Sequence, residues 1–398
     1  MGSMLFLKLL VVVLGYFFGV FFFSRGFLLT RHALLHKSSC YDVQYPVSSS
    51  SPSGCWHLRS IRKKFITTNF PWSTNCFPKN LPTFDHRKSP NFVDAGTNFA
   101  GTAIEEDNLI DQMINQGRKI TFMGDDTWMA LFPNHFNKSY PFPSFDVKDL
   151  HTVDDGILAH LYDELRSNSW DLLIAHFLGV DHCGHKYGPN HPEMSKKLHQ
   201  MDIVIRNVTK VMPDDTILFV FGDHGMTQNG DHGGDSEEEL SAALFAYSPQ
   251  RLHFEKENVH RVAAQLNLVP TLALLLDIPV PFSNLGALIP ELFPDREDRT
   301  QAARVNVYQV IRYTETYLRN FHDSVLTERF SSLLKIFNNL EADELTVEKS
   351  LDIVHKVNSI FLDSWAKFHL GWMTLGIVTI LETIVSSLVM LATKASHP

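Results

Sequence analysis

The chain has 398 residues, of which 44% are hydrophobic and 20% charged, enough for one large folded domain or two with some membrane content. Its formal net charge of −9 gives no support for nucleic-acid binding, which requires a basic face. No two of its cysteines form a C-x-x-C pair, which excludes zinc-ribbon and thioredoxin-like sites. In an oxidising compartment, two of the three N-terminal cysteines, Cys40, Cys55 and Cys76, could form a disulfide. The cysteines are Cys40, Cys55, Cys76 and Cys183.

Residues 1–35 are predicted to be a signal anchor whose transmembrane helix runs from Leu5 to Phe23. A cleaved signal peptide is the alternative, but the apolar run is long and no small-x-small cleavage site follows it. Arg25, Arg31 and Lys37 follow the span, so the charge distribution alone would place the rest of the chain in the cytoplasm.

Residues 36–90 show no regular hydrophobic pattern, and Ser48 to Gly54 is a low-complexity patch. Ile61 to Phe65 is interrupted by three basic residues, so we expect no buried strand in this region.

Residues 91–290 alternate between helical and strand-like patterns. This order predicts an α/β domain with a mostly parallel sheet covered by helices on both faces. Asp126 is expected to cap a helix rather than contact a substrate, and His191 to be a surface residue. The predicted helices span 103–116, 154–165, 191–208 and 269–276; the predicted strands span 120–123, 172–178, 216–221 and 243–247.

Two apolar strands, 172–178 and 216–221, each end in a loop rich in Asp, His and Gly. Carboxylate and imidazole groups at the carboxyl ends of parallel strands suit zinc, or manganese. Asp181 and His185 are four residues apart and would share one helical face. Helix capping and turn formation is the alternative role for one such loop, but two loops together favour a metal site. The candidate ligands are Asp181, His185, Asp223, His224 and His232, whereas Cys183 is expected to pack as a small apolar residue.

Several long motifs in this region resemble the GPI ethanolamine phosphate transferases of the alkaline phosphatase superfamily. They are FVDAGTNFAG, FMGDDTW, AHFLGVDHCGHKYGP, HPEM, GDHGMTQNGDHGGDS and LVPTLALLLDIPVPFSNLG. The resemblance implies an alkaline-phosphatase-like fold with two zinc ions. Asp181, His185 and His232 would hold one ion, and Asp223 with His224 part of the other.

The same resemblance implies transfer of phosphoethanolamine from phosphatidylethanolamine to a mannose, expected to be the third, of the GPI precursor lipid. A threonine alkoxide would carry the phosphoryl group between them. It also implies a lumenal domain at the endoplasmic reticulum membrane and a small multi-span partner subunit of the phosphatidylinositol-glycan class F type. Two sequons, at Asn137 and Asn207, would be usable in that lumen.

The chain departs from the family before Asn91. The family's first strand, its metal-binding Asp and its nucleophilic Thr have no recognisable counterpart, so we assign no catalytic residue and expect impaired transfer. An alternative transcript or a faulty gene model would explain the difference. Residues of suitable type occur there without a recognised strand before them: Ser73, Thr74, Thr83, Asp85 and Asp94.

The C-terminal part is predicted to contain a helical stalk at 291–368 and a transmembrane helix at 369–394. Glu382 within that helix suggests neighbouring membrane helices, because an intramembrane carboxylate is costly without a partner. Two other functions stay open: a non-catalytic membrane partner or truncated isoform that regulates the full-length enzyme, and a phosphodiesterase or sulfatase-type hydrolase on the same fold.

Overall fold

The computed structural model describes residues 2–27, 34–39, 64–70, 103–234, 236–249, 262–293, 295–365 and 370–395. The chain forms two compact units, Met1–His32 with Pro90–Gly96 and Leu362–Pro398, and Ala33–Ser89 with Thr97–Phe361. The first three cysteines and the nucleophile and metal candidates between Ser73 and Asp94 lie outside the described residues.

The larger unit is built on a six-stranded sheet with the strand order β3-β2-β4-β1-β5-β6. Every neighbouring pair is parallel except β5 and β6. The predicted α/β class with a mostly parallel sheet is therefore confirmed. The strands are β1 (Lys64–Phe70), β2 (Ile120–Asp125), β3 (Lys138–Phe142), β4 (Leu172–His176), β5 (Thr216–Gly222) and β6 (Leu244–Tyr247).

Strand β1 contradicts the expectation that residues 36–90 contain no strand. It lies in the middle of the sheet, with Asn69 paired to His176 of β4 and Phe70 paired to Gly222 of β5. Arg62, Lys63 and Lys64 hid it in the sequence, because basic residues at a strand entrance resemble a solvated segment. Strand β1 thus lies between β4 and β5, the two strands that lead into the predicted metal loops.

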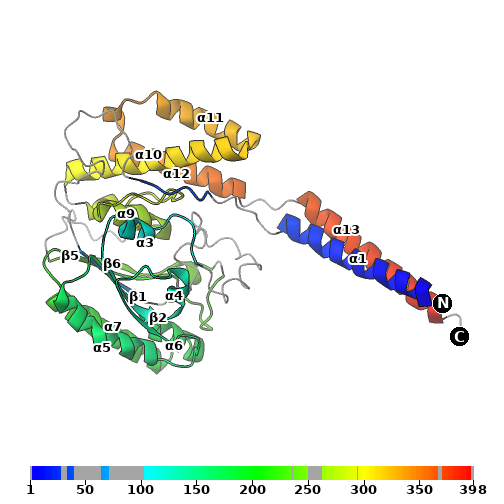
Figure 1. Cartoon of the computed structure of the whole chain (residues 1–398), viewed down its shortest axis with the longest axis horizontal. Helices are drawn as coiled ribbons and strands as arrows, with labels where there is room; N and C mark the ends of the chain where they lie inside the picture. Colours follow the sequence, from blue (N-terminus) through cyan, green and yellow to red (C-terminus); the bar gives the residue numbers. More distant parts are fainter. Residues whose placement is uncertain are drawn as a thin grey trace. The chain divides into compact units, whose positions relative to one another are not determined.

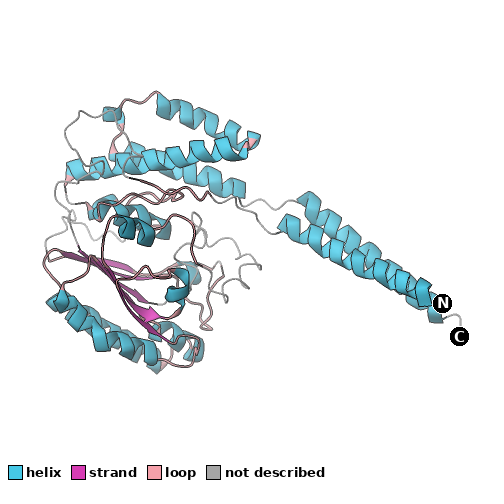
Figure 2. Ribbon diagram, in the orientation of Figure 1, coloured by secondary structure: helices cyan, strands magenta, loops and turns pink. Residues whose placement is uncertain are grey.

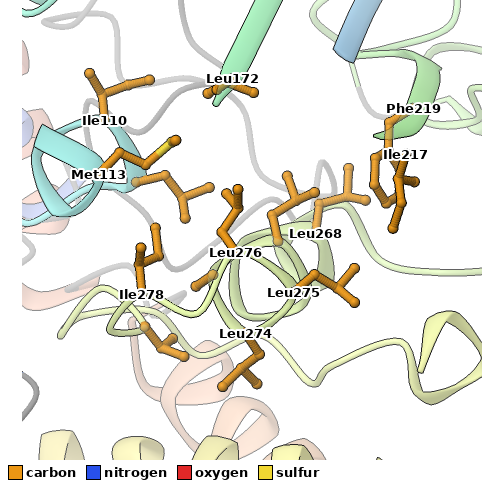
Figure 3. Close-up of a cluster of buried hydrophobic side chains, with 14 of the residues drawn as sticks. Ile110, Met113, Leu172, Ile217, Phe219, Leu268, Leu274, Leu275, Leu276 and Ile278 are labelled. Atoms are coloured by element: carbon orange, nitrogen blue, oxygen red, sulfur yellow. The ribbon is translucent and has the colours of Figure 1, made fainter. Parts of the chain in front are cut away.

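Helices cover both faces of the sheet, as predicted (Figures 1 and 2). Alternate residues of each strand point to opposite faces. In β4, Leu173 and Ala175 pack with α5 and α7, whereas Leu172 and Ile174 belong to the core shared with α3, α9 and α10. Figure 3 shows this second core around the apolar helix α9. The helices that follow the β strands are α3 (Leu109–Asn115), α4 (Thr127–Leu131), α5 (Thr152–Ser167), α6 (Gly179–Tyr187), α7 (Pro192–Val211), α8 (Glu237–Leu240), η1 (Gln265–Asn267), α9 (Leu268–Leu275) and η2 (Pro290–Leu292).

The predicted stalk is instead part of the folded domain. Ala302, Ala303 and Val305 of α10 lie in the same hydrophobic core as the sheet. Asn306 accepts a hydrogen bond from Leu288 N and donates one to Gly286 O, so α10 is also joined to the domain by buried polar contacts. The helices of this part are α10 (Arg296–Phe321), α11 (Ser324–Asn338), η3 (Ala342–Glu344) and α12 (Val347–Trp365).

The smaller unit pairs α1 (Gly2–Phe27) with α13 (Leu370–Ala395) in antiparallel fashion. A Cβ atom on Gly376 would lie 2.7 Å from Gly19 O, so the backbones approach closely, and Phe22 stacks on Trp372. Among the described residues, Leu370–Met390 is the one stretch long and apolar enough to cross a membrane, and Leu10–Arg25 is a shorter apolar helix.

Candidate metal centre

The candidate ligands come from the segments that follow β4 and β5, on either side of β1. Helix α6 begins three residues after β4 and carries Asp181 and His185 on one face, as their spacing predicted. Asp223 and His224 directly follow Gly222, the last residue of β5, and His232 lies further along the same loop. Gly230 lets this loop approach α6, because its φ is +86° and a Cβ atom there would lie 2.1 Å from Gly184 O.

The Nε2 atoms of His185 and His232 lie close to each other and to the two carboxylate oxygens of Asp181. His185 Nε2 lies 3.0 Å from His232 Nε2 and 3.4 Å from Asp181 Oδ2, and His232 Nε2 lies 3.4 Å from Asp181 Oδ1. Ligand atoms about 2.0 to 2.1 Å from a tetrahedral zinc are about 3.3 Å from one another. The spacing is therefore compatible with Asp181, His185 and His232 as ligands of one zinc ion.

Asp223 and His224 form a second pair beside the first group. His224 Nε2 lies 3.4 Å from Asp223 Oδ2, and the rings of His224 and His232 stack with centroids 3.9 Å apart. Asp181, His224 and His232 each offer an atom within 4.8 Å of the others, so the two groups adjoin.

The hydrogen bond to the other ring nitrogen fixes the orientation of His224. Its Nδ1 lies 2.7 Å from Gly225 O, and a carbonyl oxygen only accepts, so the proton of the neutral ring is on Nδ1. The Nε2 lone pair then faces the Asp223 carboxylate. Two electron-rich atoms facing each other in a buried site repel unless a cation lies between them, so the pair suits a metal ion.

The electrostatics of the site keep two imidazoles neutral. Burial lowers the pKa of His224, and burial together with the nearby His224 lowers the pKa of His232 to about 4. Burial opposes ionisation of Asp181, but the hydrogen bond from His185 and the surrounding histidines bring its pKa below the ordinary value. That hydrogen bond in turn raises the pKa of His185. Neutral imidazoles and an ionised carboxylate are the forms that bind zinc.

Two buried atoms of the group have no hydrogen-bond partner within the described part of the chain. They are Asp181 Oδ1 and His224 Nε2. A buried polar atom without a partner costs about 1 to 3 kcal/mol, which ligation of a metal would offset. The donor set therefore fits the zinc ions that the sequence predicts.

Three other residues considered in the sequence, Cys183, His191 and Asp126, make packing or hydrogen-bond contacts outside the ligand group. Cys183 is a fully buried free thiol, packed with Leu150 and Met194 as expected. His191 is exposed and its Nδ1 accepts from Glu193 N at the start of α7. Asp126 precedes α4 without capping it through its side chain, and instead accepts a hydrogen bond from Ser144.

A buried polar pair that the sequence pattern did not indicate lies at the carboxyl ends of β2 and β4. His176 ends β4 and its Nδ1 lies 2.7 Å from Asp125 Oδ2 at the end of β2, and both side chains are almost fully buried. Asp125 also accepts hydrogen bonds from the Thr127 backbone N–H and hydroxyl. In the sequence each of the two, Asp125 and His176, appears only as one polar residue at the end of an apolar run. Such a residue is easily assigned to the loop that follows the strand.

The comparisons with known proteins agree with this fold. Residues 71–267 match the family described as type I phosphodiesterase / nucleotide pyrophosphatase. The parallel sheet covered by helices is consistent with the alkaline-phosphatase-like fold of this family.

Over most of its length the chain is homologous to GPI ethanolamine phosphate transferase 3. It is 39% identical to the human catalytic subunit over 433 positions that cover 89% of this chain and 40% of the relative. It is 36% identical to the Saccharomyces cerevisiae protein over 434 positions, covering 95% and 42%. A type 2 transferase from Candida albicans is 38% identical over 247 positions, covering 57% and 28%. The chain therefore spans less than half the length of these relatives.

Proposed function

We propose that this chain carries the zinc-dependent domain of a GPI ethanolamine phosphate transferase at the endoplasmic reticulum membrane. Its substrates would be phosphatidylethanolamine and the GPI precursor lipid, with a mannose, taken to be the third, as acceptor. The main support is the 3.0 to 3.4 Å spacing of ligand atoms in Asp181, His185 and His232. The names of the relatives support the transferase over the hydrolase alternative.

Each residue of the site would have a defined role. Asp181, His185 and His232 would hold one zinc ion, and Asp223 with His224 part of a second. A zinc pair stabilises negative charge on the attacking and leaving oxygens of a phosphoryl transfer. The Gly225 carbonyl keeps the His224 lone pair directed into the site, and burial keeps His224 and His232 unprotonated at neutral pH.

We further propose that transfer by this chain is impaired. The human alignment runs over 433 positions, more than the 398 residues of this chain, so the relative has residues in that stretch that this chain lacks. The missing counterpart of the nucleophilic segment would remove the covalent step. Strand β1 fills the first-strand position, but the residues that follow it lie outside the described part of the chain.

The test measures zinc content and transfer on one preparation of the purified full chain in detergent. About two zinc ions per chain are expected, with little transfer of phosphoethanolamine to a GPI acceptor. His224→Ala and His232→Ala should each lower the zinc content, whereas the surface variant His191→Ala should not. A chain that binds no zinc would favour the non-catalytic partner, and robust transfer would overturn the predicted impairment.

Membrane association and a lumenal orientation form a separate part of the proposal. The apolar stretch Leu370–Met390 supports membrane attachment. Of the two sequons, Asn137 is exposed while Asn207 is half-buried on α7, so glycosylation is expected at Asn137. We also propose a small membrane partner of the phosphatidylinositol-glycan class F type, on the family resemblance alone.

A further inference from the structure

A buried ion pair lies at the N-terminus of α6, the helix that carries the candidate zinc ligands Asp181 and His185. Asp154, in the first turn of α5, and Lys197, in α7, have side chains that are 1% and 4% exposed. Their Oδ2 and Nζ atoms are 3.0 Å apart. Such a pair contributes little net stability, because the loss of hydration of both charges offsets their attraction. Its presence therefore needs a reason other than stability.

The other carboxylate oxygen of Asp154 caps the N-terminus of α6, which has no capping side chain of its own. Asp154 Oδ1 accepts hydrogen bonds from Leu178 N at 3.1 Å and Gly179 N at 3.0 Å. Leu178, the capping residue of α6 itself, makes no such side-chain bond. Backbone N–H groups at a helix start need acceptors, and a carboxylate also interacts favourably with the helix dipole.

Gly179 makes room for this contact. A Cβ atom at Gly179 would lie 2.2 Å from Asp154 Oδ2 and 2.7 Å from Lys197 Nζ. A side chain there would force the carboxylate away from the helix start. The absence of a side chain at Gly179 therefore allows the Asp154 carboxylate to reach the start of α6.

The position of α6 decides the geometry of the zinc group. Asp181 comes two residues after Gly179 and His185 one turn later, and both must meet His232 from a different loop. The segment before α5 holds the same helix further along, since His182 Nδ1 lies 2.7 Å from Asp149 O and Lys186 Nζ donates to Lys148 O. A small shift of α6 would break contacts of 3.0 to 3.4 Å.

We propose that Asp154, with its charge balanced by Lys197, is a positioning residue that sets α6 for zinc binding. This inference rests on the proposed zinc site. Lys197 allows the carboxylate to be buried in its charged form, and the carboxylate fixes the height and direction of α6 through two backbone bonds. Neither residue contacts the metal group itself.

Two double variants separate the acceptor from the charge. Asp154→Leu with Lys197→Met keeps the volume but removes the acceptor, whereas Asp154→Asn with Lys197→Gln keeps an oxygen for Leu178 N and Gly179 N. Zinc affinity of the purified full chain in detergent is measured by competition with a chromophoric chelator. The apolar pair should weaken zinc binding about tenfold or more, and the amide pair should restore it toward wild type. Lys196→Met, an exposed neighbour on α7, is the control and should change nothing.

Hydrogen exchange of residues 178–187 in the zinc-free chain gives a readout that does not need the metal. The apolar pair should accelerate exchange in this segment, and the amide pair should not. Faster exchange with unchanged zinc affinity would reduce Asp154 to a structural role and overturn the proposal. Wild type that binds no zinc would instead defeat the proposed function, and the inference with it. Should the apolar pair not fold, Gly179→Ala serves as the second variant, and unchanged zinc affinity there would equally overturn the proposal.

Discussion

At the scale of single residues, protons would compete with the proposed zinc ion for the same ring nitrogens. His185 is the imidazole whose pKa is raised, by its hydrogen bond to Asp181, whereas His224 and His232 titrate below the ordinary histidine value. Of these three imidazoles, His185 is therefore the first to take up a proton as the pH falls in the metal-free chain. This proton must leave before His185 can bind zinc.

Zinc affinity should consequently rise with pH up to the pKa of His185, which lies above 6.5, and then level off. Below that pKa the affinity should fall about tenfold per pH unit, because one proton competes. His185→Gln should bind zinc more weakly at pH 8 but lose most of the slope between pH 6 and 8. The measurement is chelator competition across this range, with His191→Gln as a control that keeps the slope. A full slope in His185→Gln would contradict the assignment of this proton.

At the scale of elements, the site depends on the close approach of the β5 loop to α6. Gly230 and Gly117 both have positive φ, of +86° and +69°. A Cβ atom at Gly230 would meet Gly184 O at 2.1 Å, whereas nothing lies within 4 Å of the same atom at Gly117. An added side chain would be strained by the positive φ at both positions, but only the one at Gly230 would also lack space.

Gly117→Ala should cost about 1 to 2 kcal/mol of unfolding free energy and leave zinc affinity unchanged. Gly230→Ala carries a similar strain and must also separate the loop from α6, so zinc affinity should drop about tenfold or more. Thermal unfolding and chelator competition on both variants provide the comparison. Equal zinc affinity in the two would show that the approach of loop and helix is not needed.

At the scale of the whole molecule, the helices after the sheet belong to the larger unit rather than to a stalk. Asn306 of α10 is fully buried and pairs with the backbone at Gly286 and Leu288. Gln309 donates to the carbonyls of Phe282 and Asn284 in the same way. These bonds join α10 to the loop that follows α9, so α10 should unfold together with the sheet.

Asn306→Ala should lower the unfolding free energy by about 3 kcal/mol, because it leaves a buried N–H and a buried carbonyl without partners. Asn320→Ala, on the exposed end of the same helix, should change it by about 0.5 kcal/mol or less. Zinc release during urea unfolding is the measurement, since the candidate ligands follow strands β4 and β5 of the sheet against which α10 packs. If Asn306→Ala left the zinc-release midpoint unchanged, α10 would not share the cooperative unit.

The sequence alone determined two features that depend on local patterns, the type of sheet and the set of candidate metal ligands. The alternation of strands and helices predicted the parallel sheet, and the Asp-His-Gly loops identified Asp181, His185, Asp223, His224 and His232, which the fold brings together. These features could be predicted because strand periodicity and metal-ligand residue types are local properties.

Only the tertiary structure decided where β1 lies, which helices join the core, and what Asp154 does. Strand β1 begins at Lys64, the last of three consecutive basic residues in the sequence, and its place between β4 and β5 comes from pairing with residues more than a hundred positions away. Asp154 and Asn306 resemble ordinary helix residues, since their partners are distant in sequence. A buried polar group is satisfied by whatever the fold brings to it, and that is decided by three-dimensional packing rather than by neighbours along the chain.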